Sequence, residues 1–114
     1  MDTLMIVMKS GPGAIARVGE GLRLSAALIG YDRLPVIVFV GEGVECLREG
    51  AFDGSEMVDY LKAASDLAGI HALSESLEAR GILPDDLDET IEVNPLDIDG
   101  LASMMAECDS VVTY

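Results

Sequence analysis

The sequence predicts an α/β fold: a three-layer sandwich with a mostly parallel sheet of about five strands. Short runs of wholly apolar residues, without polar alternation, are typical of strands buried on both faces. These runs alternate with segments whose apolar residues recur at helical spacing, which indicates successive β-α-β units with right-handed crossovers. A chain of 114 residues without repeats or linkers is expected to form one domain over residues 1–114.

The first strand and helix follow directly from this pattern. An apolar strand at residues 4–8 ends in the turn residues 10–13. Apolar residues at helical spacing then run from residue 14 to Gly30, which is expected to cap the helix. Gly19 and Gly21 lie inside this helix, where each costs about 1 kcal/mol relative to alanine. We therefore expect a neighbouring element to approach the helix backbone closely at these glycines.

The middle of the chain repeats the alternation. Residues 36–40 form the clearest strand, and Gly41-Glu42-Gly43 breaks it. A short helix is expected at residues 44–48 and a longer one at residues 57–69. A short strand at residues 70–73 follows.

The last third of the chain supplies two further strands. A helical turn is expected at residues 74–79, closed by Gly81. A strand is expected at residues 90–93, a helix at residues 98–108 and a final strand at residues 111–114. Asp97-Ile98-Asp99-Gly100 resembles part of a calcium loop, but the flanking positions lack the carboxylates that such a loop requires. Asp97 or Asp99 is better explained as the N-cap of the last helix.

Charge excludes several classes of partner. Seven Lys and Arg stand against 21 Asp and Glu, a net charge of −14. Such a chain repels phosphate backbones and anionic membranes, so neither direct nucleic-acid binding nor membrane binding is expected. No apolar run is long enough to span a bilayer, and the N-terminus enters a strand without a signal-peptide pattern, so a cytoplasmic protein with reduced thiols is predicted.

Ligands of parallel α/β sheets bind outside the carboxyl ends of the strands. This rule predicts a binding edge at Gly11, Gly13, Gly41, Gly43, Leu73, Ser74 and Ser76. Residues 11–16 match the dinucleotide motif G-x-G-x-x-A, but Glu42 follows later than the usual spacing of the ribose-binding acid. Turn chemistry explains these glycines better, and no cofactor is predicted.

Few side chains offer catalytic or metal-binding chemistry. His71 is the only histidine, and without a second histidine or a cysteine at ligand spacing no metal site is predicted. Ser74 and Ser76 are formal nucleophiles beside it, but a structural histidine with satisfied hydrogen bonds is favoured. Cys108 lies on the apolar stripe of the last helix and is expected to be buried. Cys46 is expected to be the more reachable thiol, although neighbouring glutamates would raise its pKa.

Four stretches occur in a particular order and spacing. They are Glu20-Gly21-Leu22, Gly43-Val44, Ser76-Leu77-Glu78-Ala79-Arg80-Gly81-Ile82 and the C-terminal segment from Asn94 to Tyr114. With them, the chain resembles the DsrE/DsrF-like family of small sulfur-relay proteins over almost its whole length. The S-L-x-x-R-G stretch and the C-terminal segment most resemble the TusC/DsrF branch of that family.

The resemblance implies a role in sulfur transfer. Members assemble as hexamers of one chain or of three related subunits. They receive persulfide sulfur and pass it to a small carrier protein, for tRNA thiolation or for dissimilatory sulfur metabolism. In members with the thiol, cysteine stands three residues before the serine of S-L-x-x-R-G. That position is Leu73 here, and leucine cannot hold a persulfide.

The sequence therefore predicts an auxiliary, non-catalytic subunit of an oligomeric intracellular sulfur-relay complex. Related subunits and a small sulfur-carrier protein are the expected partners. Two alternatives stay open: a sulfurtransferase that carries persulfide on Cys46, and a small-molecule-binding module that uses the loop at residues 11–13.

Overall fold

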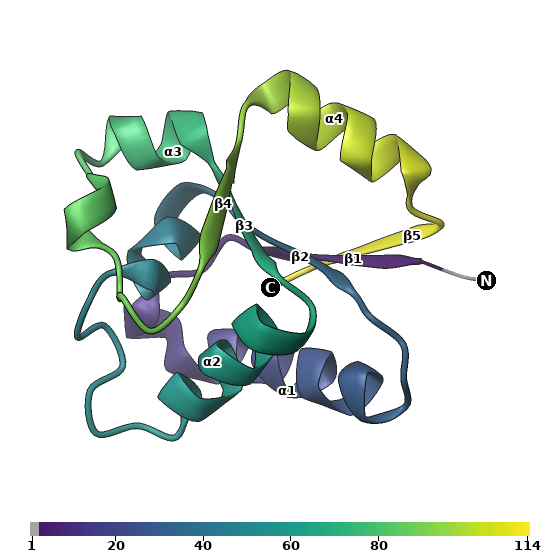
Figure 1. The fold of residues 1–114 in the computed structure, drawn as a ribbon, viewed down its shortest axis with the longest axis horizontal. Coiled ribbons are helices and arrows are strands. Elements are labelled where there is room, and N and C mark those ends of the chain that lie inside the picture. Colours follow the sequence, from purple (N-terminus) through teal and green to yellow (C-terminus); the bar gives the residue numbers. More distant parts are fainter. Residues whose placement is uncertain (1–2) are drawn as a thin grey trace.

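Five parallel strands form the centre of the protein (Figure 1). The computed structural model describes residues 3–114. The sheet has the order β4-β3-β2-β1-β5, and each neighbouring pair is parallel. The strands are β1 (Leu4–Met8), β2 (Val36–Phe39), β3 (Ile70–Leu73), β4 (Val93–Leu96) and β5 (Ser110–Thr113). The predicted α/β class is confirmed, and these strands form a fully parallel sheet.

Helices lie on both faces of this sheet (Figure 1). The helices α1 (Ile15–Gly30) and α2 (Met57–Leu67) pack together on one face, and α4 (Ile98–Glu107) covers the other. The short helix α3 (Ser74–Ala79) starts directly at the carboxyl end of β3. Residues 3–114 also contain three 3-10 helices: η1 (Pro12–Ala14), η2 (Gly41–Leu47) and η3 (Pro84–Asp86).

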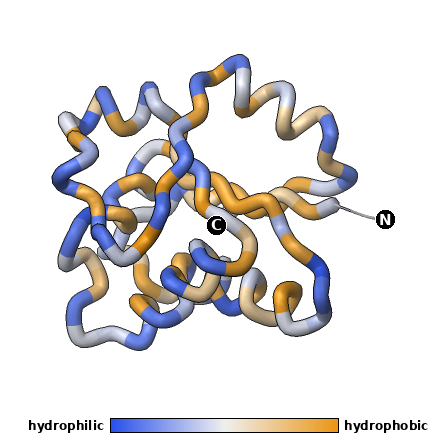
Figure 2. The backbone as a smooth tube through the Cα atoms, viewed as in Figure 1, coloured by the Kyte–Doolittle hydropathy of each residue, from blue (hydrophilic) through white to orange (hydrophobic). Residues whose placement is uncertain are grey.

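The apolar strands separate two layers of the core, and Figure 2 shows their hydrophobic residues along the centre of the molecule. Ile6 and Met8 of β1 are fully buried on the side of α1 and α2. Met5 and Val7 point to the opposite layer, where they pack with Leu101 of α4. Because both sets are apolar, the strands show no polar alternation in the sequence.

The structure corrects the predicted limits of two strands. Residues 90–93 were expected as a strand, but β4 lies at Val93–Leu96 and Thr90 belongs to a turn. The backbone N–H and hydroxyl of Thr90 both donate to Asp88 Oδ1, at 2.9 and 2.7 Å, which holds the chain in that turn. Pro95 can lie inside β4 because an edge strand has one side without a partner. The last strand, expected at residues 111–114, begins at Ser110.

Two further predictions concern helix ends. The N-cap of α4 is Asp97, whose Oδ1 accepts a hydrogen bond from the Gly100 N–H at 2.7 Å, as one of the two alternatives expected. The cap predicted at Gly30 is wrong, because Gly30 is still helical and the left-handed residue after α1 is Asp32, with φ of 59°. Asp32 therefore shapes the turn that leads from α1 to β2.

The glycines inside α1 differ in their need for space. At Gly21 a Cβ atom would lie 2.5 Å from Met8 Sδ and 3.1 Å from the Tyr114 ring, which confirms the predicted close approach. At Gly19 the nearest side chain of another element, Met57, would be in ordinary contact at 3.5 Å. Of the two glycines, only Gly21 therefore lies where another element approaches α1 closely.

Candidate functional site

The loops at the carboxyl edge of the sheet close over the end of β1. The 3-10 helix η2 folds back across this end, where the Val40 N–H donates to the Met8 carbonyl at 2.9 Å. Gly43 lies so close to β1 that a Cβ atom on it would be 1.9 Å from the Met8 carbonyl oxygen. The predicted break at residues 41–43 and the short helix at 44–48 are thus one continuous 3-10 helix, Gly41–Leu47.

Helix α3 is tied to η2 at this edge. Ser76 Oγ accepts a hydrogen bond from the Gly41 N–H at 2.9 Å, so two of the predicted edge residues meet. Leu73 occupies the N-cap position of α3, and its half-buried side chain packs against the layer of Val38 and Leu101. The neighbouring Ser74 is also half-buried.

The loop at residues 11–13 is poorly arranged for a phosphate. Gly11 lies against Glu42, whose carboxylate would stand 3.8 Å from a Cβ atom on this glycine and would repel an anion. Pro12 has no N–H, and the Ala14 N–H already donates to the Gly11 carbonyl at 3.0 Å. A phosphate-binding loop needs free N–H groups at a helix start, so this geometry favours the turn interpretation of Gly11 and Gly13.

Cys46 lies beneath this edge and is closed to solvent. It is 1% exposed, and its thiol donates to the Ser10 carbonyl at a distance of 3.4 Å. Burial raises the pKa of the Cys46 thiol to about 12, and the charge of Glu45 adds to this effect. The expectation that Cys46 is the more reachable thiol is therefore wrong, because η2 turns its side chain into the core. Cys108, expected to be buried, is only half-buried, and desolvation raises its pKa too.

We expect Cys46 to be inert in the folded protein. With a pKa of about 12 instead of 9.0, its thiolate fraction at pH 8 should be about 1,000-fold below that of a free thiol. Titration with Ellman's reagent at pH 8 should label Cys108 slowly and Cys46 only after a denaturant is added. The Cys46→Ser variant should lose the labelling that follows addition of the denaturant, which assigns that step to Cys46. Rapid labelling of Cys46 in the native protein would contradict its burial.

The same pKa shift predicts how stability depends on pH. The unfolded thiol ionises near pH 9, whereas the folded thiol keeps its proton up to about pH 12. In this window the folded state binds more protons, so the free energy of unfolding should fall as pH rises. Below pH 9 the contribution of Cys46 is constant.

His71 is half-buried in β3, between Val38 and Asn94 of the neighbouring strands. Its buried Nδ1 has no hydrogen-bond partner among residues 3–114, so the expectation of a satisfied histidine is wrong. Burial lowers the pKa of His71, which favours the neutral ring. The Ser76 hydroxyl accepts a hydrogen bond from the Gly41 N–H, and among the described residues no serine is bonded to His71 Nδ1. In the same part of the chain, no group of three or more His, Cys, Asp and Glu could hold a metal ion.

Comparison with known proteins identifies the family of this chain. A profile of the DsrE/DsrF-like family matches residues 2–114. The chain belongs to the DsrE/DsrF-like family. This family is associated with sulfur relay.

Two solved structures share the fold of this family member. The crystal structure of the ychN protein from E. coli superposes with a TM-score of 0.81 at 21% identity, over 100% of both chains. MTH1491 from Methanobacterium thermoautotrophicum, a protein of unknown function, gives a TM-score of 0.68 at 19% identity, over 99% of this chain and 98% of that one. No curated protein matches the chain significantly. Among the described residues, no helix has the length and apolar character needed to cross a membrane.

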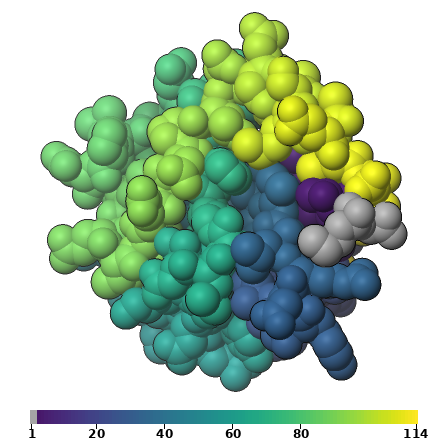
Figure 3. Space-filling model, turned by 45° about the vertical axis from the view of Figure 1, so that its right-hand side comes forward, coloured from purple at the N-terminus to yellow at the C-terminus, as the bar shows by residue number. Residues whose placement is uncertain are grey.

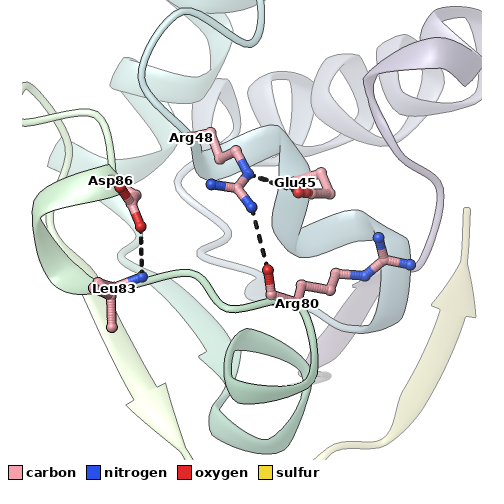
Figure 4. A network of polar contacts seen from close by, with 5 residues as sticks. All are labelled: Glu45, Arg48, Arg80, Leu83 and Asp86. Carbon is pink, nitrogen blue, oxygen red and sulfur yellow. Dashed lines mark hydrogen bonds and ion pairs between the residues drawn. The ribbon is translucent and has the colours of Figure 1, made fainter.

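The S-L-x-x-R-G stretch of this family member shapes the edge through its backbone (Figure 4). Arg48 bonds Glu45 through Nε at 2.6 Å and donates to the Arg80 carbonyl at 3.3 Å, which links η2 to the end of α3. The Arg80 side chain points away from this contact (Figure 4). The spacing of Glu45 and Arg48 indicates their pairing in the sequence, but nothing in the sequence reveals the link to Arg80.

A second link that the sequence does not reveal joins α3 to α4. Glu75 Oε2 accepts a hydrogen bond from the Ile98 N–H at 2.9 Å, at the first residue of α4. A carboxylate beside the start of a helix is favourable, because the first N–H groups there have no partner within the helix. Together with the bond between Ser76 and Gly41, this contact fixes the first turn of α3 from both sides.

Proposed function

We propose that this chain is an auxiliary, non-catalytic subunit of an oligomeric intracellular sulfur-relay complex that transfers persulfide sulfur. Residues 1–114 would act as one DsrE/DsrF-like domain in the cytoplasm. The proposal rests above all on Leu73. Where the family resemblance implies the sulfur-carrying cysteine, this chain has a leucine at the start of α3.

The edge around Leu73 is connected to the neighbouring elements by hydrogen bonds. Ser76 and Glu75 of α3 hold η2 and α4 through hydrogen bonds of 2.9 Å each. The two cysteines lie elsewhere, and Cys46 is closed to solvent. A chain that keeps this frame without the thiol can shape or complete a relay site on a related subunit, but it cannot carry sulfur at this position itself.

Surface features also support assembly with partners. Leu24 and Leu28 of α1 are half-buried against this chain's own core and offer little surface to a partner. Among the exposed apolar residues of the described chain, Ile98, Met105 and Val111 lie on and beside α4. Exposed apolar surface favours protein contacts, and the net charge of −14 would steer a basic carrier or companion subunit.

Purification with light scattering tests the proposal. The protein is produced alone and together with a related chain that has cysteine at the position of Leu73, and each sample is passed through size-exclusion chromatography. We expect an oligomer or a stable complex with the companion. A monomer that captures no related subunit would contradict the proposed role. The matched variant Met105→Glu should weaken assembly, whereas Leu67→Glu on α2 should not.

The same preparation tests the enzyme alternative. A sulfurtransferase using Cys46 predicts a persulfide adduct of about 32 Da after exposure to a sulfur donor, absent in Cys46→Ser. The burial of Cys46 argues against this outcome. The alternative of a small-molecule-binding module has no support from the loop at residues 11–13, because Glu42 stands beside it.

A further inference from the structure

The edge of the sheet opposite to Leu73 contains a cavity of about 450 Å³. It lies where β1, β2 and β5 begin, beside the turn that follows α1. Figure 3 shows the start of β1 in purple, this turn in dark blue and the C-terminal segment in yellow on one side of the molecule. The cavity is lined by aliphatic residues and a few polar ones: Leu4, Leu28, Leu34, Pro35, Asp32 and Arg33.

The wall of this cavity is preformed. The Tyr31 and Arg33 N–H groups donate to the Leu28 carbonyl at 3.0 and 2.9 Å, and the Asp32 N–H donates to Ile29 at 3.0 Å. These bonds and the left-handed backbone at Asp32 fix the turn between α1 and β2. Small-molecule sites are typically concave, largely apolar and formed before the ligand arrives, with volumes of about 300–1,000 Å³.

Apolar side chains remain exposed at its mouth. Leu34 is 59% exposed, and the neighbouring Tyr31 is 82% exposed, so folding of the described chain leaves both mostly in water. A ligand with an apolar body would cover part of this surface. The area it removes from water would stabilise the complex by about 25 cal/mol per Å².

Arg33 gives the cavity a preference for negatively charged ligands. The described chain has two ion pairs, Arg23–Glu56 and Arg48–Glu45, and Arg33 belongs to neither. A guanidinium beside an apolar cavity suits a carboxylate or sulfonate, which it can bind through two parallel hydrogen bonds. Asp32 also lines the cavity and would oppose an anion, so the two side chains have opposite effects that can be measured separately.

We propose that this cavity binds a small amphiphilic anion, with its apolar body against Leu4, Leu28 and Leu34 and its acidic head at Arg33. The site is separate from the carboxyl edge and does not depend on the proposed relay function. Its ligand class is a medium-chain or aromatic carboxylate or sulfonate.

Fluorescence with 8-anilinonaphthalene-1-sulfonate tests the site. This dye is an apolar anion, which the overall charge of −14 would otherwise repel. We expect saturable binding that weakens at least about tenfold in Leu34→Glu, which adds a negative charge at the mouth. Leu67→Glu is the matched control, because Leu67 is similarly exposed at 57% and lies on α2 away from the cavity. Near-ultraviolet circular dichroism verifies that each variant is natively folded.

Competition by eight-carbon ligands determines the charge preference. Octanoate should displace the dye better than octanol, and octylamine should be the weakest competitor. Arg33→Gln should remove the advantage of octanoate over octanol. Asp32→Asn should strengthen octanoate binding several-fold, because it removes the negative charge that opposes the anion. Asparagine accepts the same backbone conformation, so the turn should be kept. Unsaturable dye binding, equal effects of the Leu34 and Leu67 variants, or a preference for octylamine would overturn the proposal.

Discussion

Replacing Gly43 by alanine should destabilise the protein by about 3 kcal/mol, the upper end of the usual cost of overpacking a core. The added Cβ atom would lie 1.9 Å from the carbonyl oxygen of Met8 and 2.8 Å from its carbonyl carbon. Both are backbone atoms of a buried strand, so no side chain can rotate away to relieve the clash. Urea denaturation monitored by far-ultraviolet circular dichroism measures the loss, as a lower midpoint at an unchanged slope.

Gly13→Ala is the matched control for this variant. A Cβ atom at Gly13 would meet no atom within 4 Å, so the free energy of unfolding should change by less than about 0.5 kcal/mol. Both glycines lie in 3-10 helices of the carboxyl edge, Gly13 in η1 and Gly43 in η2, and both substitutions add one methyl group. Equal midpoints for the two variants would mean that η2 does not press against the end of β1.

Gly43 also shows what the sequence could not predict. The glycine indicated that the strand before it ends, which is correct, since β2 ends at Phe39. Its contact with Met8, 35 positions earlier in the chain, depends on the tertiary fold and has no local signal. The same limit applies to Cys46, because the turn of η2 decides whether its side chain faces solvent or core.

Local patterns predicted the sheet well where strands are central. β1 and β2 are apolar runs that are almost wholly buried, β3 also contains the half-buried His71, and the positions of all three were predicted to within one residue. β4 was misplaced because an edge strand need not be apolar, and its asparagine and proline are typical of a loop. The unpaired Nδ1 of His71 was not foreseen either, since hydrogen-bond partners depend on neighbouring strands.

Restoring a cysteine at Leu73 should give the chain the ability to carry sulfur. The Leu73→Cys variant, made in a Cys108→Ser background, should gain about 32 Da after exposure to a persulfide donor, whereas the background protein should not. The thiolate at residue 73 would attack the outer sulfur of the donor, and the donor would leave as a thiol. Intact-mass spectrometry measures the adduct, and a reductant should remove it.

The position of Leu73 favours this reaction. Its side chain is half-buried at the N-cap of α3, and the start of a helix can lower the pKa of a thiol, although the charge of Glu75 opposes this effect. Leu67→Cys in the same background offers an exposed thiol on α2 that lacks such a setting. It should therefore accept sulfur more slowly than cysteine at position 73. Equal rates would mean that the surroundings of Leu73 no longer favour sulfur transfer. A faster reaction at position 73 would mean that the thiol is the missing part of an otherwise competent site, which is the condition the proposed auxiliary role requires.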